Sequence, residues 1–151
     1  MAIRKEGAFF EILLPNGKYS YGRILPKADY TFYDIYVDER ISDIKKIRES
    51  KVLFIVAVYK DAVTKGRWKK IAYLDLEPTL QVLPLKFIED ALNPGIYEIY
   101  NPNTGEITST TKDKCLSLER SAVWEAKHVE ERIVDHFEGK TNKWVEQLKL
   151  K

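Results

Sequence analysis

The chain has 151 residues, of which 44% are hydrophobic and 32% are charged, and its net charge is +2. These values are typical of one folded domain with a buried core, and they exclude a disordered chain. The longest apolar run, residues 52–59, is too short to cross a bilayer. The single cysteine, Cys115, excludes an internal disulfide. Since no apolar segment follows the basic N-terminus, we expect a cytoplasmic protein.

The charged residues are unevenly distributed along the chain. A basic segment spans residues 60–70, and an acidic segment spans residues 117–138. The net charge is too small to indicate a nucleic-acid partner by itself. No repeat, low-complexity tract or Gly/Pro-rich linker divides the chain, so we predict a single domain over residues 1–151.

The first two thirds of the chain are predicted to form strands. Residues 7–25 predict a hairpin, because the Asn16-Gly17 dipeptide favours a tight turn in which both residues have positive φ. Aromatic and β-branched residues predict a strand over residues 30–37. Isoleucine recurs every third residue between 40 and 48, which fits either a helical turn or an edge segment. Further strands are predicted at residues 52–59, 68–76 and 85–89, and a second hairpin at residues 96–110.

The last third of the chain is predicted to be helical. An apolar stripe predicts a helix from about Ser117 to Gly139, and the glycine is placed to end it. The stripe consists of Leu118, Ala122, Val129, Ile133 and Phe137. A short helix is predicted at residues 142–148. Strands followed by helices predict an α+β fold, with a curved antiparallel sheet or small open β-barrel and the amphipathic helix packed on one side.

Signatures of catalysis are missing from the sequence. It has no glycine-rich phosphate loop, no G-x-S-x-G elbow and no H-E-x-x-H motif. Cys115 precedes a leucine, a setting more typical of a buried thiol than of a nucleophile. His128 and His136, with the acids between them, supply only a partial set of zinc ligands. We therefore predict no catalytic residue, no metal and no cofactor.

Trp124 is the most informative residue of the predicted long helix, because it lies opposite the apolar stripe. Its neighbours on that side are polar: Arg120, His128, Glu131 and Asp135. In one interpretation, Trp144 and Val145 of the final helix fold over the indole. In the other, Trp124 is an aromatic anchor surrounded by acids, which suits a basic protein surface.

Two further groups of residues have open roles. Tyr19, Tyr21 and Arg23 alternate onto one face of the second strand, opposite Gly22, and they point either outward or into the core. The basic segment combines cations with an indole, in Lys65, Arg67, Trp68, Lys69 and Lys70. It suits either a single-stranded nucleic acid or a solvated hairpin whose lysines block strand pairing.

The spacing G-x-Y-x-Y-G-R, from Gly17 to Arg23, resembles the N-terminal signature of the immunity protein 26 family of bacterial polymorphic toxin systems. The resemblance continues through the aromatic strand at residues 30–36, the Val52-Leu53-Phe54 strand and the strand from Trp68 toward Pro78. It implies a protein without catalytic residues that binds and neutralises a cognate secreted toxin domain. Such an interface would bury about 1,600 Å². The candidate partner-binding residues are Tyr19, Tyr21, Arg23, Arg120, Trp124, His128, Glu131 and Asp135.

Overall fold

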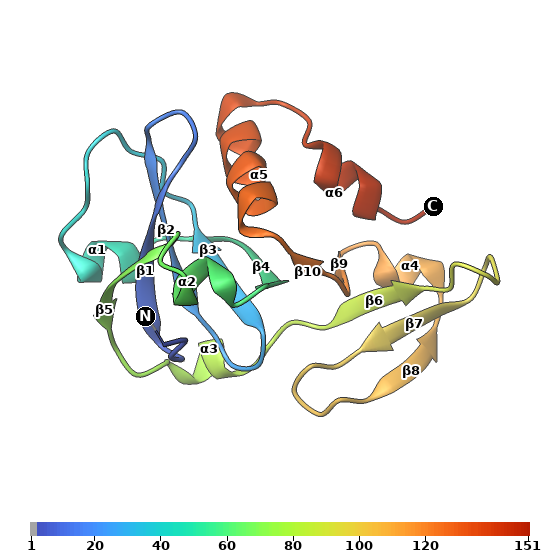
Figure 1. The fold of residues 1–151 in the computed structure, drawn as a ribbon. Helices are drawn as coiled ribbons and strands as arrows, with labels where there is room; N and C mark the ends of the chain where they lie inside the picture. Colours follow the sequence, from blue (N-terminus) through green and yellow to red (C-terminus); the bar gives the residue numbers. More distant parts are fainter. Residues whose placement is uncertain (1–2) are drawn as a thin grey trace.

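The computed structural model describes residues 3–151 and has the predicted α+β class (Figure 1). Within these residues, ten strands form two mixed sheets, and neither sheet closes into a barrel. The six-stranded sheet A has the order β10-β4-β3-β2-β1-β5, and the four-stranded sheet B has the order β8-β7-β6-β9. The β10–β4 and β6–β9 pairs are parallel, and the other pairs are antiparallel.

The elements have the following bounds. Sheet A contains β1 (Ala8–Leu13), β2 (Tyr19–Ile24), β3 (Asp29–Tyr33), β4 (Val52–Val58), β5 (Lys69–Tyr73) and β10 (Val123–Trp124). Sheet B contains β6 (Lys86–Glu89), β7 (Tyr97–Tyr100), β8 (Ile107–Thr110) and β9 (Glu119–Arg120). The helices are α1 (Ile44–Arg48), α2 (Asp61–Thr64), α3 (Pro78–Gln81), α4 (Lys112–Cys115), α5 (Ala126–Glu138) and α6 (Lys143–Leu148). No helix in this part of the chain is long and apolar enough to cross a membrane.

The predicted opening hairpin is β1–β2, but its turn differs from the prediction. Gly17 has a φ of +85°, whereas Asn16 does not adopt positive φ. The Leu14 N–H donates to the Lys18 carbonyl, so three residues form the loop. Pro15 explains the difference, because its ring fixes φ near −65° and favours a three-residue loop that ends in a left-handed glycine.

Both faces of sheet A are interior. On one face, Phe10 and Phe32 pack around Trp68 and against Val129 and Ile133 of α5. On the other face lies a second cluster, formed by Phe9, Tyr21, Tyr33, Ile35 and Ile47. The alternation of side chains along each strand therefore supplies two cores rather than a core and a solvated face.

Position 22, which faces the first of these cores, has room only for glycine, because a side chain there would collide with its neighbours. An added Cβ would lie 2.4 Å from Cζ of Phe10 and 2.7 Å from the Thr31 carbonyl oxygen. The glycine therefore lets the Phe10 ring approach the sheet, while Tyr21 and Arg23 fill the opposite face.

The predicted start of the long helix at Ser117 is wrong, because α5 begins at Ala126. The residues before it extend both sheets. β9 pairs with β6, and β10 pairs with β4. The backbone N–H of Ser121 donates to Phe87, and that of Tyr59 donates to Trp124. Strand pairing thus supplies the backbone hydrogen bonds of a segment whose apolar spacing also fits a helix. The helix ends as predicted at Gly139, with a φ of +70°.

The chain forms two sheets where the sequence suggests one curved sheet or barrel. The break follows β5, where Pro78 begins α3 and cannot donate to a strand ladder. A buried ion pair joins the sheets, because Nζ of Lys86 on β6 lies 2.6 Å from Oδ1 of Asp29 on β3. Within the segment at residues 40–48, Ile44–Arg48 form the short helix α1, which agrees with the prediction of a helical turn there.

Candidate partner-binding surface

Arg23 is a structural residue. Its side chain is fully buried, and its guanidinium group lies over the Phe9 ring. Nη1 lies 2.8 Å from a carboxylate oxygen of Glu77. Nε donates to the Gly7 carbonyl, and Nη2 donates to the carbonyls of Leu74 and Asp75. Arg23 therefore fastens the segment that leaves sheet A toward sheet B, and it is not available to a partner.

Tyr21 is buried as well, and its hydroxyl connects two segments. The hydroxyl donates to Oε2 of Glu11 at 3.0 Å and accepts from the backbone N–H of Ile41 at 2.7 Å. Burial raises the pKa of Tyr21 to about 12. Tyr19 is half-buried, with the Arg40 guanidinium over its ring. The tyrosines of the signature therefore hold the loop before α1 against sheet A.

The basic segment does not present Trp68 to solvent. The indole is fully buried and stacks on Phe10, with ring centroids 5.1 Å apart. Its Nε1 donates to the buried carboxylate of Glu130, which also accepts two bonds from Arg67. Base stacking on this indole is therefore excluded by its burial.

The lysines of the basic segment lie away from the Trp68 indole, on or near the edge of sheet A. Lys65 and Lys69 are exposed, whereas Nζ of Lys70 donates to the Ile3 carbonyl. Since Lys69 and Lys70 lie on the edge strand β5, their positions fit the role of lysines that block strand pairing.

Trp124 and Arg120 do not lie on α5, which corrects their predicted placement. Trp124 lies on β10, is only 4% exposed, and has the Arg132 guanidinium 5.1 Å from its ring. The indole is therefore part of the core and not an exposed anchor.

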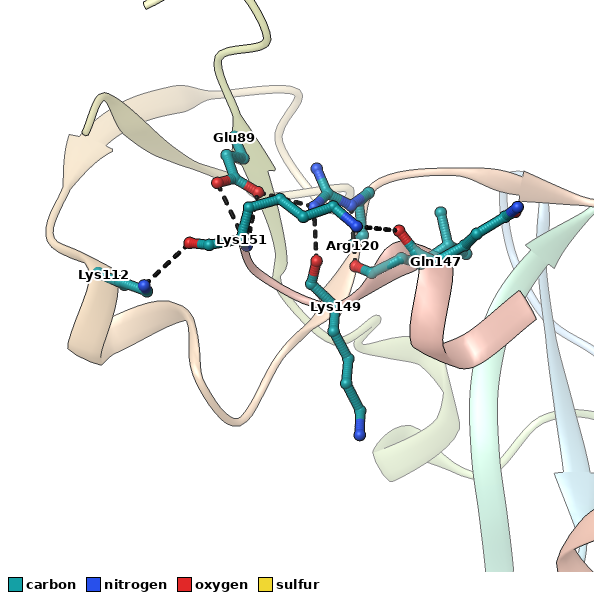
Figure 2. Close-up of polar contacts among 7 residues, drawn as sticks. Glu89, Lys112, Arg120, Gln147, Lys149 and Lys151 are labelled. Carbon is teal, nitrogen blue, oxygen red and sulfur yellow. Dashed lines mark hydrogen bonds and ion pairs between the residues drawn. The ribbon is translucent and has the colours of Figure 1, made fainter. Parts of the chain in front are cut away.

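Arg120, on β9, fastens the end of the chain to sheet B (Figure 2). Its Nη2 donates to Oε1 of Glu89 at 2.8 Å and to the Lys149 carbonyl, and its Nε donates to the Leu148 carbonyl. The hydrogen bond from Arg120 lowers the pKa of Glu89. These contacts hold the end of α6 beside sheet B, so Arg120 acts within the fold.

His128, Glu131 and Asp135 do lie together on α5, and α6 covers them. The His128 ring stacks on Trp144, with centroids 3.6 Å apart. The Trp144 indole N–H donates to Glu131, and Nδ2 of Asn142 donates to Asp135 at 2.9 Å. The final helix therefore folds over this polar face. One interpretation expects Trp144 and Val145 to cover Trp124; both pack against the core cluster that contains Trp124, and the Trp144 ring itself stacks on His128.

The carboxylates of the acidic segment differ in whether a cation neutralises them. Glu119 is paired with Arg132, and Glu130 is paired with Arg67. In contrast, the groups that donate to Glu131 and Asp135 are an indole and an amide, which carry no charge. Neither the Glu131 nor the Asp135 carboxylate therefore accepts a hydrogen bond from a cationic side chain in the part of the chain that the structure describes.

These two residues line a groove of about 590 Å³ between α5, the start of α6 and the β1–β2 turn. We call it the acidic groove; its lining residues are Pro15, Asn16, Glu131, Val134, Asp135, Glu138, Thr141 and Lys143. The sequence placed Glu138 in the acidic segment and predicted the turn, but it did not indicate that they line one groove, because the approach of the turn to α5 is a tertiary contact without a local pattern. Nζ of Lys140 lies 3.2 Å from Oε1 of Glu138.

The described residues contain no group of three or more His, Cys, Asp or Glu placed to hold a metal ion. Cys115 is fully buried, and its thiol contacts the Thr111 carbonyl. Burial raises the pKa of this thiol, which favours the protonated form over a reactive thiolate.

Part of the chain is similar to a known protein family. The family model for immunity protein 26 matches residues 5–104, about two thirds of the chain. The chain belongs to the immunity protein 26 family. The matched part contains β1 to β7, including the buried signature residues Tyr21 and Arg23. No curated protein and no solved structure matches the chain significantly.

Proposed function

We propose that this member of the immunity protein 26 family binds the toxin domain of a bacterial toxin system and neutralises it, which protects the producing cell and its kin. The observation that carries the proposal is the family match over residues 5–104. Neutralisation by binding requires a complementary surface and no catalytic group. The proposed partner is therefore a protein, and the proposed place of action is the cytoplasm.

We place the contact with the toxin at the acidic groove. Three carboxylates, those of Glu131, Asp135 and Glu138, line the groove against one cation, Lys143, and the side chains that donate to Glu131 and Asp135 are neutral. Such a surface favours a partner with a basic face, since opposite charges steer the encounter of two proteins. A toxin that acts on nucleic acid carries a basic substrate cleft, so a nuclease domain is the class of partner that this charge favours.

The first step of the test is to identify the protein that the neighbouring gene encodes. A large secreted protein with a variable C-terminal domain is expected to be encoded beside the gene for this chain. The purified C-terminal domain, titrated with the chain, is expected to form a stable complex whose affinity falls as salt is added.

Two variants with the same change in charge test the proposed surface. Glu131→Gln/Asp135→Asn keeps both hydrogen-bond acceptors of the acidic groove but removes two charges. We expect its affinity for the toxin domain to fall by about tenfold or more. Glu39→Gln/Glu49→Gln removes two exposed charges near α1, which packs on the other face of sheet A, and is expected to bind like the wild type.

The possible outcomes separate the function from its location. A complex whose affinity is the same for all three proteins rejects the acidic groove and keeps the immunity function. The absence of any complex with the cognate domain rejects the function itself.

A further inference from the structure

Residues 148–151, which we call the strap, carry the chain from the end of α6 to sheet B (Figure 2). Lys149 has a φ of −66° and a ψ of 156°, so the backbone leaves the helix in an extended conformation. The side chains alternate in burial, because Leu148 and Leu150 are half-buried whereas Lys149 and Lys151 are exposed. This is the pattern of an extended peptide that lies on a surface and directs every second side chain toward it.

Three side chains from three elements hold the strap, and each of them contacts its backbone (Figure 2). Nε and Nη2 of Arg120 on β9 donate to the carbonyls of the first two strap residues. Oε1 of Glu89 on β6 accepts from the Lys151 N–H at 3.3 Å, and Nζ of Lys112 on α4 donates to the main-chain oxygen of Lys151 at 2.9 Å. These contacts recognise an extended backbone rather than a particular side chain.

The two lysine side chains of the strap bond back to α6. Nζ of Lys149 lies 2.8 Å from a carboxylate oxygen of Glu146, and Nζ of Lys151 donates to the Gln147 carbonyl. In the part of the chain that the structure describes, the strap therefore contacts sheet B and α4 through its backbone and its leucines.

The leucines of the strap do not fill the space beside them. Leu148 and Leu150 line a cavity of about 390 Å³, which is within the range of roughly 300–1,000 Å³ that ligand pockets have. Most of the other lining side chains are apolar, among them Phe87, Cys115, Leu118, Trp124 and Val145. These side chains lack packing partners on the cavity side, and a ring larger than leucine would supply them.

We propose that β6, β9 and α4 form a peptide groove, that the strap is its exchangeable occupant, and that the groove accepts an extended segment of a partner protein. The strap itself selects this class of partner, because it shows that the groove holds an extended backbone with an apolar side chain at position 150. The segment that fits best carries an aromatic side chain in the place of Leu150, since a ring fills the cavity. This inference does not depend on the proposed function.

Variants of the full chain test whether the cavity receives a ring. Leu150→Trp is expected to fill the cavity and to slow hydrogen exchange of the Lys151 amide, which donates to Glu89. The matched control Lys149→Trp places the same ring on the exposed side of the strap and is expected to leave this exchange rate unchanged. Nuclear magnetic resonance measures both rates.

Peptides added to the full chain test the exchange. Leu150→Asp is expected to release the strap, since it places a carboxylate in an apolar cavity. Leu150→Ser, which adds no charge, is a second way to release it. The probes are two peptides with the sequence of residues 147–151, one unchanged and one with Leu150→Trp, and titration followed by nuclear magnetic resonance measures their affinity.

We expect both released chains to bind either peptide at least about tenfold more tightly than the wild-type chain, whose own strap competes at a high effective concentration. The peptide with Leu150→Trp is expected to bind about tenfold more tightly than the unchanged one.

A pair of lysine variants tests whether the peptide lies in the groove. Added to a released chain, Lys112→Met removes a donor to the strap backbone and is expected to weaken peptide binding by about threefold. Lys114→Met removes another exposed lysine of α4 and is expected to bind like the released chain.

Four results would overturn the proposal. These are folded released chains that bind neither peptide, a wild-type chain that binds the peptides as tightly as the released chains, equal affinities after Lys112→Met and Lys114→Met, and equal exchange rates at Lys151 after Leu150→Trp and Lys149→Trp.

Discussion

Sheets A and B differ in how far their strands are buried. Every residue of β3 is buried, as are all but the last residue of β1. In sheet B, β7 is half-buried throughout, and three of the four residues of β8 are exposed. Sheet A is covered on both faces because Phe10 and Phe32 lie in one core while their neighbours Phe9 and Tyr33 lie in the other. Sheet B has an open edge and only partial cover.

Tyr21 and Arg23 of the family signature are buried in sheet A, whereas the proposed partner surface lies outside both sheets. The buried residues Tyr21 and Arg23 of the signature lie in the second core of sheet A or beside it, where they fasten the segments that flank the sheet. The acidic groove is formed mostly by α5 and α6, beyond the matched residues 5–104. The family signature and the proposed contact with the toxin therefore lie in different parts of the chain.

Replacing Arg23 is expected to have the largest effect on stability. Arg23→Ala leaves three backbone carbonyls and the Glu77 carboxylate without their donor, in a site where the arginine side chain is fully buried. We expect the free energy of unfolding to fall by about 2–4 kcal/mol, because the carbonyls lose their donor and a large buried side chain is removed, while the partly exposed Glu77 carboxylate adds little. Chemical denaturation measures it. A loss below about 1 kcal/mol would show that this arginine is not essential to sheet A.

A methyl group at Gly22 tests the close packing of sheet A. The added Cβ of Gly22→Ala would collide with the Phe10 ring and the Thr31 carbonyl. We expect a loss of about 1–3 kcal/mol, the usual cost of overpacking. Gly105→Ala is not a suitable control, because that glycine has a φ of +81°. Ser109→Ala on the exposed edge is suitable and is expected to change stability by less than about 0.5 kcal/mol.

Alkaline pH probes the second core through Tyr21. Its pKa of about 12 in the folded chain lies above the value near 10 of an unfolded chain, so only the unfolded chain loses this proton between the two values. The stabilisation is therefore complete below about pH 10 and is lost as the pH rises through about 12. We expect the stability of Tyr21→Phe to fall less steeply over this range. Equal slopes would contradict the burial of the hydroxyl.

A matched pair of isoleucines compares the two sheets directly and is expected to give the smallest effects. Ile12 on β1 is fully buried, whereas Ile107 on β8 is 53% exposed. Ile12→Val is expected to cost about 1 kcal/mol, and Ile107→Val less than about 0.5 kcal/mol. Thermal unfolding of both variants measures the difference. Equal losses would contradict the unequal burial of the sheets.

Local signals predicted much of the fold. The alternation of apolar residues predicted most strands, Gly139 predicted the end of α5, and Asn142 begins α6 as its N-cap. The segment before α5 was predicted incorrectly because Leu118 and Ala122 continue the helical apolar spacing. The backbone of this segment instead pairs with β6 and β4, which lie far away in the sequence, so a local pattern could not reveal it.

The candidate site was less predictable, because contacts between segments distant in sequence also decide which of its side chains are buried. The shared position of His128, Glu131 and Asp135 followed from helical periodicity and was confirmed. The burial of Trp68 and Trp124 did not follow, because an indole beside charged residues fits an exposed anchor as well as a core residue with a paired charge nearby. Glu130 and Arg132 supply the neighbouring charges, and both lie on α5.

Growth of cells that express the cognate toxin domain is the most direct test of the proposed immunity function. We expect co-expression of this chain to restore growth. We also expect Glu131→Gln/Asp135→Asn to protect less well than Glu39→Gln/Glu49→Gln at equal protein levels. Continued growth arrest in the presence of the folded wild-type chain would contradict the proposed immunity function.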